Sequence, residues 1–145
     1  MPKHFTLERA GRLIPRLDAL VRDAMARKTE YAEAGRDILS STERIMLMGG
    51  MTVDRGSALS RRARHDSAAA QLRDSLEAIQ ALGCLLKDLD QGLADFPTLY
   101  RGAEVCLCWQ VGETAIRFWH GVDEGFAGRK PIDRDFLEHH GGESD

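Results

Sequence analysis

Residues 6–50 read TLERAGRLIPRLDALVRDAMARKTEYAEAGRDILSSTERIMLMGG, and this stretch decides the fold class. Apolar side chains recur in it every seven residues, at Ala10, Leu17, Ala24, Tyr31, Ile38 and Ile45. This spacing keeps one side of a long helix facing a partner helix. Thr6 is the predicted N-cap, and Gly49-Gly50 the predicted end of the helix. Because a proline ring clashes with the carbonyl group four residues earlier, Pro15 predicts a kink or an early break near residues 11–15.

A second helix is predicted over residues 58–91, after a loop that runs through Ser57. Its inward-facing residues are Leu72, Leu76, Ile79, Leu82, Leu86 and Leu89. Gly92 is the predicted C′ residue, because glycine adopts the left-handed conformation freely. Two such helices joined by a short loop form a long antiparallel helical hairpin over residues 5–91. Since an isolated helix pair leaves apolar surface exposed, we expect a homo-oligomer formed through the long helices. The pattern is that of a coiled coil weakened in the middle, where Lys28, Gly35 and Thr42 occupy core positions.

Beyond Gly92 the apolar pattern changes from a helical period to the alternation of a strand. Residues 104–110 predict a strand whose faces carry Val105, Leu107 and Trp109 on one side and Cys106 and Cys108 on the other. A turn around Gly112-Glu113 leads to a second predicted strand over residues 115–120. Residues 92–132 are therefore expected to form a small antiparallel β-hairpin module, and residues 133–145 a flexible charged tail. The chain is predicted to be one domain over residues 1–145, mainly α within the α+β class.

The composition limits which classes of partner and which cellular compartment we expect. The net charge of −3 argues against a general nucleic-acid-binding protein. Residues 1–83 carry a net charge of +3 and residues 84–145 a net charge of −6, so the second part is better suited to cations or basic partners. The three cysteines do not suggest a disulfide framework. No apolar signal core and no 18-residue apolar run is present, so we expect a cytoplasmic protein without a membrane span.

The sequence also resembles a known family. The motifs that carry the resemblance are Leu86-Lys87-Asp88, Gly92-Leu93, Asp95-Phe96-Pro97, Leu107-Cys108-Trp109, Gly112-Glu113, Phe118-Trp119-His120 and Gly125-Phe126-Ala127-Gly128-Arg129. Together with the opening Phe5-Thr6-Leu7-Glu8 and Leu13-Ile14-Pro15, they are similar to DUF2203, a prokaryotic family of unknown function, over about residues 4–132. The resemblance implies a prokaryotic source. It implies no activity, so no catalytic residue is assigned.

Residues 95–129 concentrate the side chains that could carry chemistry. The candidate ligand-binding residues are Asp95, Cys108, Glu113, Trp119, His120, Asp123 and Arg129. One interpretation is a divalent metal site in which His120 is the imidazole ligand and Asp123, Glu113 or Asp95 supplies carboxylate. The other is a buried His120 that makes one hydrogen bond, with the acids solvated on turns. No ligand spacing here matches a familiar metal motif, which favours the second interpretation.

The two neighbouring cysteines suggest a zinc site with His120, and strand geometry argues against it. A loop with an even number of residues would put Val105, Leu107 and Trp109 on the same face as His120, and both cysteines on the opposite face. An odd loop would bring the cysteines and His120 together, but would mix the polarity of each face. Because register follows the more uniformly apolar face, we expect the even loop. Cys108 is then a small buried hydrophobic residue, or else a nucleophile activated by Arg117.

A basic cluster of Arg55, Arg61, Arg62, Arg64 and His65 lies at the start of the second helix, and we interpret it as a solvated surface. Two functions remain. The first is a non-catalytic, homo-oligomeric helical protein whose C-terminal module binds a protein partner or a small ligand. The second is a metal-binding protein or a metal-dependent enzyme with a site around His120.

Overall fold

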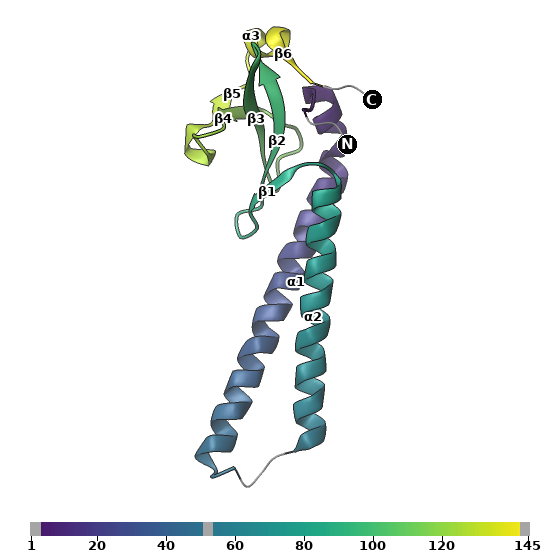
Figure 1. Cartoon of the computed structure of the whole chain (residues 1–145), viewed down its shortest axis with the longest axis vertical. Coiled ribbons are helices and arrows are strands. Elements are labelled where there is room, and N and C mark those ends of the chain that lie inside the picture. Colours follow the sequence, from purple (N-terminus) through teal and green to yellow (C-terminus); the bar gives the residue numbers. More distant parts are fainter. Residues whose placement is uncertain (1–3, 51–53, 143–145) are drawn as a thin grey trace. The chain divides into compact units, whose positions relative to one another are not determined.

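The computed structural model describes residues 4–50 and 54–142 and is an α+β protein (Figure 1), which confirms the predicted class. Its helical elements are α1 (Leu7–Leu47), α2 (Arg55–Ala81), the 3-10 turn η1 (Phe126–Gly128) and α3 (Arg134–His139). Its strands are β1 (Leu85–Asp88), β2 (Leu93–Tyr100), β3 (Ala103–Gln110), β4 (Phe118–Gly121), β5 (Lys130–Pro131) and β6 (His140–Gly141). Within the described residues, no helix combines the length and apolarity that crossing a membrane requires. The predicted loop at 49–57 and the predicted tail at 133–145 each include residues outside those described.

The chain divides into two compact units, Asp23–Leu76 and the remainder, which consists of Met1–Arg22 and Glu77–Asp145. Within Asp23–Leu76, side chains from α1 and α2 meet in pairs. Ser75 Oγ donates to Asp23 Oδ2 at 2.7 Å, and the Arg61 guanidinium lies 3.5 Å from Asp37 Oδ2. Because residue numbers rise along one helix as they fall along the other, α1 and α2 run antiparallel in this unit.

Both ends of α1 lie where short-range capping rules predict them, but Pro15 does not break the helix as predicted. Thr6 Oγ1 accepts a hydrogen bond from Arg9 N at 3.1 Å, which confirms the predicted N-cap. After Leu47, Gly50 N donates to Ile45 O at 2.8 Å, so the helix ends at the double glycine. The predicted break near Pro15 is wrong, because the helix continues through it. Buried apolar residues on both sides of the proline, Ala10, Ile14, Leu17 and Val21, offset the lost hydrogen bond through packing.

The second helix is shorter than predicted, because it ends at Ala81 rather than at residue 91. Gly83 has a φ of 94°, and this left-handed conformation turns the chain out of the helix. Residues 85–88 then form β1 instead of two more helical turns. Gly92 is therefore not a helix C′ residue but part of the turn between β1 and β2. A Cβ atom there would lie 2.4 Å from Val111 Cγ1, so no larger residue fits.

The C-terminal module is larger than the predicted β-hairpin. It is a six-stranded antiparallel sheet in the order β1-β2-β3-β4-β5, with β6 paired to β2. The expected strand over residues 104–110 is β3, and β2 pairs with it along its whole length, from Leu93 opposite Gln110 to Tyr100 opposite Ala103. The sheet therefore has two long central strands, both visible in Figure 1.

The predicted register between β3 and the strand after it is wrong. Cys106 lies opposite His120, and Cys108 lies opposite Phe118, so both cysteines share a face with His120. The intervening loop, residues 111–117, has an odd number of residues. Residues 105–109 are all buried, so both faces of β3 are covered and a preference for the more apolar face cannot set the register.

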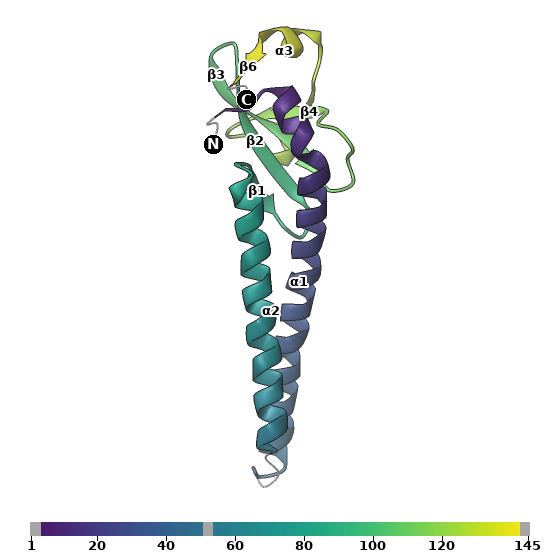
Figure 2. The same cartoon turned by 90° about the vertical axis from the view of Figure 1, so that its right-hand side faces the viewer.

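One face of the sheet packs against the two ends of the chain. Phe5 meets Phe96 edge-on with ring centroids 5.1 Å apart, and Phe136 of α3 stacks on Trp119 at 5.1 Å. His140 Nε2 accepts a hydrogen bond from Leu7 N at 3.0 Å, which joins the C-terminal segment to the start of α1. Figure 2 shows these first turns of α1 beside the sheet, near α3. The segment around α3 is therefore ordered and partly buried, in contrast to the flexible tail expected there.

We predict that Phe136→Ala lowers the free energy of unfolding by about 3–5 kcal/mol, because this fully buried ring leaves a cavity among aromatic neighbours. Urea unfolding followed by circular dichroism measures the change. Leu137→Ala is the matched control, since Leu137 is 50% exposed and its removal should change stability by less than about 0.5 kcal/mol. Equal effects of the two substitutions would contradict the packed arrangement of α3.

Candidate functional site

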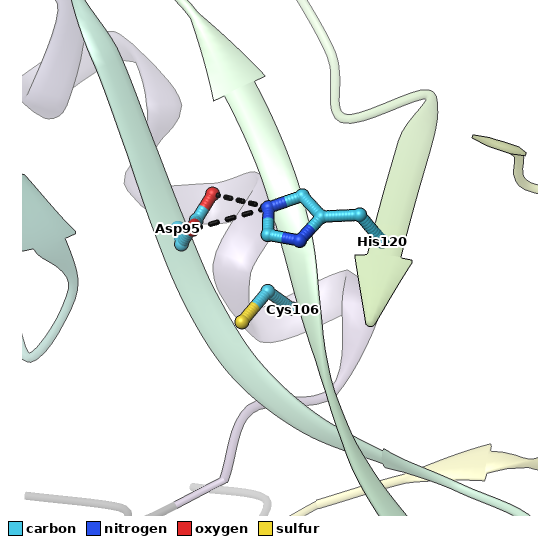
Figure 3. A group of neighbouring side chains, drawn as sticks. All are labelled: Asp95, Cys106 and His120. Carbon is cyan, nitrogen blue, oxygen red and sulfur yellow. Dashed lines mark hydrogen bonds and ion pairs between the residues drawn. The ribbon is translucent and has the colours of Figure 1, made fainter. Parts of the chain in front are cut away.

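Three adjacent strands each contribute one polar side chain to the other face of the sheet. Asp95 comes from β2, Cys106 from β3 and His120 from β4. Cys106 and His120 are directly paired, and Asp95 pairs with Cys108, two residues along β3 from Cys106. Side chains two residues apart on a strand point to the same face, so the three side chains converge. Figure 3 shows them pointing toward one another.

The three side chains form a compact buried group. The relative exposures of Asp95, Cys106 and His120 are 2%, 7% and 3%. His120 Nε2 lies 3.1 Å from each carboxylate oxygen of Asp95 (Figure 3). One ligand atom from each of the three residues lies within 4.8 Å of the other two. Nitrogen, oxygen and sulfur donors thus face a single point inside the protein.

The hydrogen bond made by Nδ1 of His120 determines which ring nitrogen carries a hydrogen. His120 Nδ1 lies 2.7 Å from the carbonyl oxygen of Gly121. A carbonyl oxygen only accepts hydrogen bonds, so Nδ1 carries a hydrogen. Nε2 then either carries a second hydrogen, which makes an imidazolium–carboxylate pair with Asp95, or directs a lone pair at the carboxyl group. The lone-pair arrangement is repulsive unless a proton on Asp95 or a bound cation lies between the two groups.

The cysteines of this region are neutral thiols in the absence of a bound cation. Burial raises the pKa of the Cys106 thiol to about 11, the negative charge of Asp95 adds to the effect, and the Lys87 ammonium opposes it. Burial also raises the pKa of Cys108, against the hydrogen bond from Arg129. Cys84, buried elsewhere, has its pKa raised by burial to about 11. Because the thiolate is the nucleophile, the raised pKa of Cys108 argues against the alternative of a nucleophile and agrees with the expectation of a small buried hydrophobic residue.

A cavity of about 180 Å³ lies beside the three converging residues. Leu93, Val122 and Phe126 contribute its apolar lining. Lys87, an exposed side chain of β1, lines the same cavity and is the only lysine or arginine among its described lining residues. A small molecule in this cavity would therefore contact both the buried donors and one ammonium group.

A second polar group surrounds Arg129. Its guanidinium donates to Glu113 Oε1 at 2.6 Å and to Cys108 Sγ at 3.3 Å. It also lies against the rings of Phe118 and Phe126, 4.3 and 4.7 Å from their centroids. Arg129, rather than Arg117, is thus the arginine that contacts Cys108. The Glu113 carboxylate pairs with Arg129 and is not part of the group formed by Asp95, Cys106 and His120.

The remaining predicted residues lie apart from this group. Trp119 is on the opposite face, against Tyr100 and Phe136. Asp123 is exposed. The residue that sequence reasoning missed is Cys106, which it placed on the wrong face of β3. Two features of the sequence could have identified it. Cys106 and Cys108 alternate along one strand, and a loop with an odd number of residues between the two strands puts them on the face of His120.

Comparison with known proteins identifies one family. The family described as "Uncharacterized conserved protein (DUF2203)" matches residues 3–132. No curated protein matches the chain, and no solved structure matches it.

We predict that Asp95→Ala lowers the stability of the metal-free protein by about 3 kcal/mol, because it leaves the buried His120 without its charged partner. Thermal and urea unfolding measure this change. Asp123→Ala removes the same group from an exposed position and should change stability by less than about 0.5 kcal/mol. If Asp95→Ala were equally mild, the buried pair would not exist in solution.

Proposed function

The chain belongs to the DUF2203 family, and we propose that it binds one Zn²⁺ ion through Asp95, Cys106 and His120, with the fourth coordination position open to the adjacent cavity. This proposal keeps His120 and Asp95 from the metal site considered from the sequence, replaces Asp123 and Glu113, and adds Cys106. It also makes the C-terminal module the ligand-binding part of the protein.

The donor atoms favour zinc over harder cations. Ca²⁺ and Mg²⁺ take oxygen ligands almost exclusively, whereas the group here includes a thiol and an imidazole. Zn²⁺ accepts sulfur, nitrogen and carboxylate oxygen together. Three protein ligands with a fourth position left for water or a ligand is the arrangement of zinc sites that act on a bound molecule. Purely structural zinc sites have four protein ligands instead.

The hydrogen bond from His120 Nδ1 to Gly121 O is the single observation that carries the proposal. Metal-binding histidines almost always donate their other ring N–H to a carbonyl or carboxylate group, which fixes the tautomer and the ring orientation. In His120 that bond leaves Nε2 facing both oxygens of Asp95 at 3.1 Å. A Zn²⁺ ion between Nε2 and the carboxylate would replace the proton that otherwise has to lie there.

The separations between donors are close to those of a tetrahedral site. Zinc bonds of 2.0–2.2 Å to nitrogen and oxygen imply a nitrogen-to-oxygen separation of about 3.3 Å, against the 3.1 Å between His120 Nε2 and Asp95. The corresponding separation from sulfur is about 3.6 Å. Cys106 Sγ lies within 4.8 Å of the other two donors. Metal binding therefore requires the thiol to approach by at most about 1.2 Å.

The energetics of the metal-free pair of Asp95 and His120 also support a cation site. Removing two charges from water costs several kcal/mol per ion, and a buried ion pair is often no more stabilising than apolar residues of the same volume. Asp95 and His120 are nevertheless almost completely buried, in a sheet whose other buried side chains are apolar or aromatic except for that of Thr98. A role in binding a cation explains why a carboxylate, a thiol and an imidazole occupy these positions.

We predict that untagged protein purified without chelator carries one zinc per chain, as measured by native mass spectrometry and elemental analysis. Cys106→Ser should weaken zinc affinity by more than about 100-fold, because losing a ligand costs more than losing an outer hydrogen-bond partner. Cys108→Ser is the matched control, with the same substitution two residues along β3 and on the same face. It should retain zinc affinity within about threefold.

Two results would contradict the zinc proposal. One is a Cys106→Ser variant that binds zinc as the wild type does while its circular dichroism spectrum is unchanged. The other is a wild-type protein that takes up no zinc when the metal is supplied. Because serine is nearly isosteric with cysteine, loss of zinc in Cys106→Ser cannot be ascribed to unfolding when the Cys108→Ser variant behaves normally.

A second function, self-assembly, is favoured by the composition of the unit Asp23–Leu76. We propose that its two helices form a helical hairpin that packs against a second copy of the chain. Its buried residues, among those described, are all small: Ala24, Ala34, Ser41, Ala68 and Ser75. Large apolar residues of the same unit are exposed, with Leu39 at 65%, Leu59 at 71% and Leu47 at 88%. Helices of this kind gain most of their stability from packing, which a second copy would supply.

We predict that the double variant Leu39→Glu/Leu59→Glu sediments as a smaller species than the wild type in analytical ultracentrifugation. Charges placed on apolar side chains that a second copy buries would have to be desolvated, so association is lost. Leu137→Glu, a similar change at an exposed leucine of α3, should sediment as the wild type does. A wild-type protein that is monomeric at all concentrations would contradict self-assembly.

A further inference from the structure

Lys87 carries a charge beside the proposed zinc site but is not one of the three zinc ligands. It lies on β1, where the pairing with β2 shifts between Leu86 and Asp88 and makes Lys87 the extra residue of a bulge. Bulges often redirect a side chain next to a functional site. Within the described part of the chain, the side chain of Lys87 makes no hydrogen bond or ion pair. It nevertheless lines the same cavity as Asp95, Cys106 and His120.

The charges around the cavity favour a bound monoanion. A Zn²⁺ ion held by the Asp95 carboxylate and the Cys106 thiolate has no net charge. The ion pair of Arg129 with Glu113 is internally balanced, as is that of Lys130 with Glu124. Lys87 then adds one uncompensated positive charge at the cavity. A ligand with a single negative charge would neutralise it.

The lining of the cavity restricts the rest of the ligand. Leu93, Val122 and Phe126 provide apolar contacts, and its volume is about 180 Å³. An apolar cavity of about 150 Å³ accommodates benzene, so this one has room for a ligand of roughly six to eight non-hydrogen atoms. A phosphate group has nearly two negative charges at neutral pH and no apolar part, and it fits this cavity less well.

We propose, on the basis of the proposed zinc site, that the fourth zinc position takes the carboxylate of a small organic acid, that Lys87 binds its second oxygen, and that Leu93, Val122 and Phe126 hold its apolar chain. Carboxylate oxygen is an ordinary zinc ligand, and a lysine ammonium forms charge-assisted hydrogen bonds with it. The site is thereby specific for acid groups rather than for alcohols or amines of the same size.

Isothermal titration of zinc-loaded protein with sodium butyrate tests this inference, with n-butanol and inorganic phosphate as comparison probes. Butyrate should bind at one per chain and n-butanol at least about tenfold more weakly, because it lacks the charged hydrogen bond. Lys87→Gln should weaken butyrate binding at least about tenfold for the same reason, and Lys87→Arg should restore most of it. Lys28→Gln makes the same change of charge at an exposed lysine outside the cavity, and should leave binding unchanged.

The zinc content of each variant, measured beside the titration, separates failure of this inference from failure of the zinc proposal. One zinc per chain with no butyrate binding, or with equal binding in wild type and Lys87→Gln, overturns the carboxylate inference and leaves the zinc site intact. Tighter binding of phosphate than of butyrate also overturns it, because the acid class is then wrong. Absence of zinc in the wild-type protein overturns both proposals.

Discussion

Burial of strand β3 on both of its faces is the constraint on which the rest of the structure depends. Residues 105–109 are all buried, so every side chain of this segment has to be matched by a neighbour on one face or the other. Leu107 and Trp109 meet the apolar residues of one face. Cys106 and Cys108 point to the other, where Asp95 and His120 also lie. Because side chains alternate strictly along a strand, a shift of one residue would separate the donors.

The two faces of the sheet therefore have different roles. On one, Phe5, Phe96, Trp119 and Phe136 pack together, and His140 caps the start of α1, so the ends of the chain hold the sheet in place. The other face carries the polar group and its cavity. Donors placed on three neighbouring strands keep their positions better than donors on loops, so the proposed site would be formed before a metal ion binds. The glycine-containing segment after His120 covers this face and supplies the apolar wall formed by Val122 and Phe126.

The sequence was informative where structure is determined locally. The long first helix, its Thr6 cap and its double-glycine end follow from short-range rules, and the structure has all three. The second helix was predicted too long, because Leu86 and Leu89 continue the helical spacing beyond Gly83, although Leu86 lies in β1 and Leu89 in the turn that follows it. Asp95 and His120 were named as candidates from residue type alone. Cys106 was not, because its position depends on a long-range register that the apolar pattern of a strand buried on both faces does not determine.

A zinc ion bound by Asp95, Cys106 and His120 together would have one sulfur ligand. X-ray absorption at the zinc edge, on protein loaded with one equivalent of Zn²⁺, counts the sulfur ligands. We expect one sulfur at about 2.3 Å with nitrogen and oxygen ligands at about 2.0–2.2 Å, and loss of the sulfur signal in Cys106→Ser. A coordination sphere of nitrogen and oxygen alone in the wild-type protein, or two sulfur ligands that include Cys108, would rule out zinc binding by these three residues.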